Sequence, residues 1–121
     1  MLFEYARDEA LRRIRVVGLR RYQLPDVVAL LERQVADGAW GYGALIDLRV
    51  GMLPPDDVQA VVRYIEHLSH QHGPRGPVAL VAADQQTAQA YALDSARIGQ
   101  AVEVFRYAFQ AERWLDEQTR R

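Results

Sequence analysis

Two short, almost wholly apolar runs constrain the fold of this chain more than any other feature of its sequence. Tyr42–Leu48 and Pro77–Ala83 have the length of β-strands, and they contain too few polar residues to leave one face in water. The stretch between them predicts a helix, because Pro54–Asp57 is a good helix start and Gly73–Pro74 is a stop. A strand, a helix and a second buried strand in succession predict parallel neighbours in a sheet that is covered on both faces.

The rest of the chain extends this alternation. Leu2–Ala6 and Leu11–Leu19 predict an antiparallel hairpin, and the second run places Ile14 and Val16 between arginines, as in a strand with one face in water. The remaining predicted elements are a helix from Pro25 to Asp37, a helix over Gln85–Ile98 with Asp84 as its N-cap, a strand over Val102–Arg106 and a helix over Phe109–Glu117. Residues 1–121 therefore predict a single α/β domain with a mixed, mostly parallel five-stranded sheet, element order ββαβαβαβα, an N-terminal antiparallel hairpin and helices on the sheet faces.

The composition excludes several kinds of chemistry. Without cysteine, the chain cannot form disulfides, thiolate metal ligands or a cysteine nucleophile, and since all 15 basic residues are arginine it has no Schiff-base or P-loop lysine. The net charge of -1 gives no general attraction to nucleic acid, and no apolar run is long enough to span a membrane. Acidic residues interrupt the N-terminus before a secretory h-region forms. We expect a cytoplasmic protein with no cofactor.

Polar residues near the predicted carboxyl ends of the strands are candidates for a functional site. Asp47 and Arg49 lie two apart at the end of one buried strand, and Asp84 and Arg106 follow its neighbours. Ligands of open α/β sheets collect beyond such ends, which favours a small polar pocket or a charged contact surface for a partner protein. The alternative is structural: Asp47 pairs with an arginine or caps a loop, and Asp84 caps its helix.

Three motifs in succession give the chain a resemblance to a known group. LIDLR (Leu45–Arg49), PVALVAAD (Pro77–Asp84) and VEVFRYAFQAERWL (Val102–Leu115) resemble the SpoIIAA-like proteins, which are related to STAS domains and to the lipid-binding CRAL-TRIO fold. The ending carries the resemblance most strongly, with a strand that finishes in Phe105-Arg106 and a helix that contains Trp114. The resemblance covers essentially the whole chain in element order.

The resemblance also implies a position for regulation. STAS domains that antagonise anti-sigma factors carry a phosphorylatable serine at the start of the helix after a central strand. This chain has no Ser or Thr between Ala44 and Leu68, whereas Asp56 and Asp57 supply acid at the corresponding helix start. The resemblance therefore implies a bacterial regulatory module without the phosphorylation switch, and it adds these two acids to the candidate contact residues.

Two clusters of charged or titratable residues have a functional and a structural interpretation. His67, His70 and His72 suggest a metal site, but a polar helix end explains them more simply. Arg12, Arg13, Arg15, Arg20 and Arg21 suggest a ribbon that binds nucleic acid or an anionic lipid surface, but charges that guard an edge strand from unwanted pairing are the preferred explanation.

Aromatic residues and hydroxyls complete the candidates. Trp40 and Tyr42 are expected to pack at the core or its rim, with partner binding as the alternative. Trp114 is expected in the core. None of the four Ser and Thr residues lies in a nucleophile motif.

Two functional hypotheses from different classes follow. The first is a non-catalytic STAS/SpoIIAA-like module that acts through a protein partner or by self-association. The second is a small-ligand or lipid-binding domain of the CRAL-TRIO type. An enzyme that uses Asp47 and Asp84 as paired carboxylates is a distant third, and the prediction is that the chain is not an enzyme.

Overall fold

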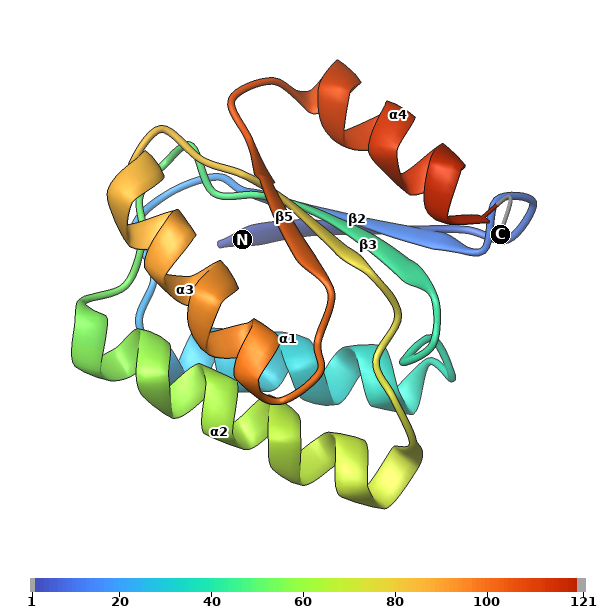
Figure 1. The fold of residues 1–121 in the computed structure, drawn as a ribbon, viewed down its shortest axis with the longest axis horizontal. Helices are drawn as coiled ribbons and strands as arrows, with labels where there is room; N and C mark the ends of the chain where they lie inside the picture. Colours follow the sequence, from blue (N-terminus) through green and yellow to red (C-terminus); the bar gives the residue numbers. More distant parts are fainter. Residues whose placement is uncertain (1, 120–121) are drawn as a thin grey trace.

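The computed structural model describes residues 2–119, which form one five-stranded sheet and four helices (Figure 1). The sheet order follows the chain, β1-β2-β3-β4-β5, with β1 antiparallel to β2 and the other neighbours parallel. The predicted fold class, hairpin and order of elements are confirmed. The elements are β1 (Phe3–Asp8), β2 (Arg13–Gly18), α1 (Leu24–Ala36), β3 (Gly43–Asp47), α2 (Pro55–His72), β4 (Val78–Val81), α3 (Gln85–Arg97), β5 (Val102–Phe105) and α4 (Ala108–Thr119).

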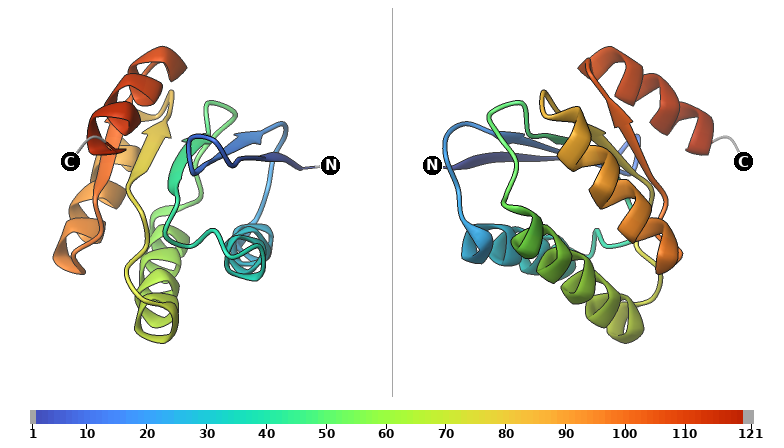
Figure 2. Two further views of the ribbon diagram at one scale, coloured as in Figure 1. Left: turned by 90° about the vertical axis from the view of Figure 1, so that its right-hand side faces the viewer. Right: turned by 60° about the vertical axis from the view of Figure 1, so that its left-hand side comes forward.

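The helices cover the two faces of the sheet unequally. α1, α2 and α3 lie together on one face, and α4 lies alone on the other, against β3, β4 and β5 (Figures 1 and 2). Each of the first three helices connects a strand to its next parallel neighbour in the same direction along the sheet. Since such crossovers are right-handed, they must all fall on the same side.

Each face of the sheet has its own apolar core. On the three-helix face, the apolar side chains along one side of α2 pack with Leu31 of α1 and Leu80 of β4. On the α4 face, Ala111 and Leu115 pack onto β3 and β4. All four residues of β4 are buried, so the prediction of a strand covered on both faces is confirmed. Trp114 is only partly buried and lies against Phe105, with 6.1 Å between the ring centroids.

The second strand departs from its predicted environment. Ile14 and Val16 point into the three-helix core, as expected. The opposite face, expected in water, carries Arg13 with only 2% of its surface exposed, because the polar edge of α4 reaches over it. The prediction of a wet face on this strand is therefore wrong at Arg13.

Close backbone packing at the amino ends of the strands depends on one glycine. Gly76 lies between α2 and β4, and its N–H donates to the Trp40 carbonyl at 3.0 Å. A Cβ atom at this position would lie 2.2 Å from the Tyr42 carbonyl oxygen and 2.6 Å from that of Gly41. The two loops can touch only because residue 76 has no side chain.

We therefore expect Gly76→Ala to lower the free energy of unfolding by roughly 1–3 kcal/mol, because the backbone must move to relieve the clash. Gly41→Ala is the matched control, since a Cβ there meets no atom within 4 Å. Urea unfolding followed by circular dichroism measures both. Equal midpoints for the two variants would contradict the close packing.

Candidate functional site

Asp47 and Arg49, the first predicted pair, are brought together at the end of β3. Arg49 Nε lies 3.0 Å from Asp47 Oδ1, its Nη2 lies 2.6 Å from Oδ2, and its backbone N–H also donates to Oδ1 at 3.1 Å. The Asp47 carboxylate raises the pKa of Arg49 by accepting these hydrogen bonds. Asp47 is 6% exposed, so this pair satisfies a nearly buried carboxylate and fixes the turn after the strand.

Asp84, the second predicted acid, caps α3. Its Oδ1 accepts from the backbone N–H of Thr87 at 3.1 Å, as the predicted N-cap requires. The Thr87 hydroxyl and this N–H hold the pKa of Asp84 below its usual range. The structure therefore supplies a structural use for both Asp47 and Asp84.

The other predicted residues divide between two grooves. Asp57 joins Asp84 in an open groove of about 810 Å³ at the carboxyl ends of the strands, which we call the rim groove. Arg106 lines a different groove of about 480 Å³, beside α4, with Trp114 and Glu117. Asp56 is exposed in the first turn of α2. The six predicted residues thus share one end of the sheet but do not converge on a single pocket.

The sheet order explains why they do not converge. A crevice beyond the strand ends forms where the strand order reverses and helices leave to opposite faces. Here the order β1-β2-β3-β4-β5 never reverses. The carboxyl ends therefore form a continuous rim with α1 to α3 on one side of it.

Comparison with family models, curated proteins and solved structures gives no match to this chain. Its own geometry therefore carries the functional argument.

The rim groove combines apolar and acidic lining. Val50, 43% exposed, Met52 and Leu53 come from the β3–α2 loop, and Asp57 and Asp84 add carboxylates. Arg21 also lines the groove. Within residues 2–119, neither Asp57 nor Asp84 forms an ion pair.

A second hollow, which the sequence analysis missed, lies inside the three-helix face. This inner cavity has a volume of about 70 Å³, and its walls are mostly aliphatic side chains of α1, α2, β3 and β4. Arg75, 9% exposed, also lines it, from the loop between α2 and β4. One feature of the sequence could have indicated a buried arginine. Arg75 stands in the stretch GPRGP, and the strand that follows directly has only apolar residues.

Two arginines of the predicted ribbon, Arg13 and Arg15, pair with acids of α4. Arg13 Nη2 lies 2.8 Å from Asp116 Oδ1, and Arg15 Nη2 lies 2.7 Å from Glu112 Oε2. Asp8 of β1 completes this α4 ionic cluster with a contact of 3.2 Å to Arg15. The hydrogen bond from Arg15 to the Glu112 carboxylate contributes most to the raised pKa of Arg15. These arginines hold α4 on the sheet, so the interpretation that they guard an edge strand is wrong for Arg13 and Arg15.

The remaining candidates have structural positions. Trp40 and Tyr42 are each 5% exposed, which confirms that they pack in the core. His67 stacks on Tyr64 with 6.1 Å between the ring centroids. Within residues 2–119, no group of three or more His, Asp or Glu side chains is arranged to hold a metal ion. Over the same residues, no helix has both the length and the apolar character needed to cross a bilayer.

The cap at Asp84 gives a pH prediction. An acid whose pKa is lowered on folding stabilises the fold above its unfolded pKa, and that contribution is lost as the pH falls through the folded pKa. Asn caps a helix as well as Asp does, so Asp84→Asn should keep its stability at neutral pH and lose less than the wild type on acidification, whereas Asp84→Ala should be weaker at neutral pH. Urea midpoints at neutral and acidic pH measure this. An Asn variant with undiminished acid sensitivity would contradict it.

The α4 ionic cluster gives a second prediction. Glu112→Gln leaves Arg13 and Arg15 with one carboxylate fewer, and the expected loss of stability is about 1 kcal/mol, since Glu112 is partly exposed. Glu117→Gln, exposed on the same helix, should change stability by less than about 0.5 kcal/mol. Chemical denaturation compares the two, and equal losses would show that the cluster does not anchor α4.

Proposed function

We propose that this chain is a non-catalytic binding module of the STAS/SpoIIAA-like kind, which acts by protein contact at the rim groove. The proposed occupant is a segment of a partner protein that presents an apolar side chain next to a basic one. The observation that carries the proposal is the combination in one open groove of exposed Val50 with Asp57 and Asp84. An apolar contact next to acidic side chains selects a partner by both shape and charge.

Two features of the same rim support a binding role over catalysis. The Asp47 carboxylate accepts hydrogen bonds from Arg49, and the Asp84 carboxylate caps the start of α3. A catalytic carboxylate must instead be able to exchange a proton with a substrate atom at hydrogen-bond distance. Asp47 and Asp84 maintain the shape of the rim.

Site-specific photo-crosslinking tests the proposal. A photo-crosslinking amino acid in place of Val50 should give a discrete protein adduct in the cells that naturally express the chain. The same amino acid in place of Leu93, which is 67% exposed on α3 away from the groove lining, is the matched control and should not give that adduct. Asp57→Arg should reduce the adduct, because it replaces an acid of the groove by a cation and leaves the Asp84 cap intact.

Two results would overturn the proposal: no adduct from position 50, or the same adducts in the same yield from positions 50 and 93. An adduct with the mass of two copies of the chain would identify the partner as a second copy.

The small-ligand hypothesis is favoured by a separate observation, the inner cavity with its buried arginine.

A further inference from the structure

We propose that the inner cavity binds a small apolar monocarboxylate, whose carboxylate pairs with Arg75. The site does not depend on the rim groove, because it lies under α1, α2 and α3. The cavity walls are mostly apolar, and among the described residues that line them the one charged side chain is that of Arg75, so the ligand should have a hydrocarbon part and a single anionic group.

Arg75 is incompletely paired. Its Nη2 donates to Gln34 Oε1 at 3.0 Å, and its Cζ lies 5.2 Å from the centroid of the Trp40 ring. Within residues 2–119, no Asp or Glu forms an ion pair with it, and its buried Nε has no hydrogen-bond partner. A guanidinium stays charged in proteins, so the fold holds a buried positive charge without a matching negative one.

This arrangement is costly unless an anion completes it. Removing an ion from water costs several kcal/mol, and a neutral amide and an aromatic ring offset only part of that. Burial accordingly lowers the pKa of Arg75, with the Tyr91 hydroxyl opposing the effect. A carboxylate can accept from Nε and from a terminal nitrogen of a guanidinium together, which is the geometry that Arg75 leaves incomplete.

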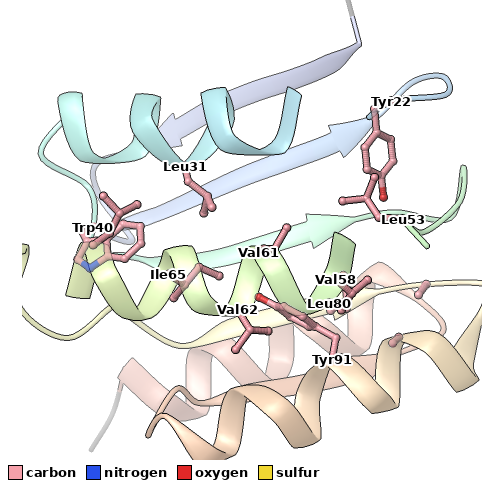
Figure 3. Packing of buried hydrophobic residues seen from close by; sticks show 13 residues of the cluster. Tyr22, Leu31, Trp40, Leu53, Val58, Val61, Val62, Ile65, Leu80 and Tyr91 are labelled. Carbon is pink, nitrogen blue, oxygen red and sulfur yellow. The ribbon is translucent and has the colours of Figure 1, made fainter. Parts of the chain in front are cut away.

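The walls define the rest of the ligand. Leu31, Val61, Ile65 and Leu80 line the cavity, and few polar groups are present to hold water there. Figure 3 shows Tyr22 and Leu53 together at one end of this layer and Trp40 at the other. A volume of about 70 Å³ is about half that of an apolar cavity that holds benzene, so it fits a short-chain acid and excludes an aryl acid or a long-chain lipid.

An entry route is available from the carboxyl ends of the strands. Tyr22, Met52 and Leu53 line both the inner cavity and the rim groove, so they separate the two. The Tyr22 hydroxyl donates to the Gly51 carbonyl at 2.7 Å and links the loops on either side.

Titration of the purified full chain with propionate tests the proposal, and propionamide is the neutral probe of nearly the same shape. Calorimetry and backbone NMR should show propionate binding roughly tenfold or more tightly than propionamide, because the hydrogen bonds to Arg75 become charge-assisted on both sides. The Nε–H resonance of Arg75 should shift with propionate and much less with propionamide. Formate and chloride, which lack the apolar body, should bind more weakly than propionate.

Matched variants locate the site. Arg75→Met, which keeps an apolar chain of similar length, should remove the preference for propionate over propionamide, whereas Arg63→Met on the exposed side of α2 should leave it unchanged. Val61→Phe should fill the cavity and weaken both probes while Arg75 remains. If Arg75→Met does not fold, the Val61→Phe variant and the Nε–H resonance of Arg75 still show whether the probe binds in the inner cavity. Val50→Asp, at the rim groove, should bind propionate as the wild type does, which separates this proposal from the protein-contact proposal.

Three outcomes would overturn the assignment. These are no propionate binding at millimolar concentration, equal affinity for propionate and propionamide in the wild type, and chloride or formate binding as tight as that of propionate.

Discussion

Parallel pairing of β3 with β4 is the constraint on which the other layers depend. Both strands are buried in the middle of the sheet, so each needs cover on two faces. α2 connects them and covers one face, and α1 and α3 join it because every crossover has the same hand and direction. Only the chain after β5 is left to cover the other face. α4 does this with Ala111 and Leu115, and its polar edge lies over β2, where Arg13 and Arg15 meet its acids.

The same winding determines where the molecule is hollow. With the strand order unreversed, the carboxyl ends form no deep crevice, and the polar residues there pair with nearby groups. Three helices on one face must instead pack against a twisted sheet and against each other. The inner cavity lies in that layer, between α1, α2 and the sheet, and Arg75 enters it from the loop that precedes β4. The hollow most suited to a small ligand is thus inside the domain, whereas the rim offers an open groove.

Residue patterns along the chain predict the fold well because each element is decided locally. The apolar runs at β3 and β4, the Pro55 start of α2 and the Asp84 cap of α3 all act within a few residues, and all are found as expected. The sequence also predicts correctly that Asp47 and Arg49 lie together. It does not predict that Arg13 is buried, because the acids that pair with it, Glu112 and Asp116, lie about a hundred residues away on another element. Long-range pairing of charges follows from how α4 is placed, which no local pattern contains.

Arg75 shows the same limit, with a greater consequence. Its neighbours Gly73, Pro74 and Gly76 predict an ordinary turn, and an arginine in a turn is expected in water. The close approach made possible by Gly76 draws the loop against Trp40, and the side chain has to pass into the core. A purely structural role would be met as well by an apolar side chain of similar length, which could pack on Trp40 without the cost of a buried charge. That role accounts for the bond to Gln34 and the contact with the ring but leaves Nε without a partner next to an apolar cavity. A carboxylate ligand accounts for the charge, the unpartnered nitrogen and the adjoining space together.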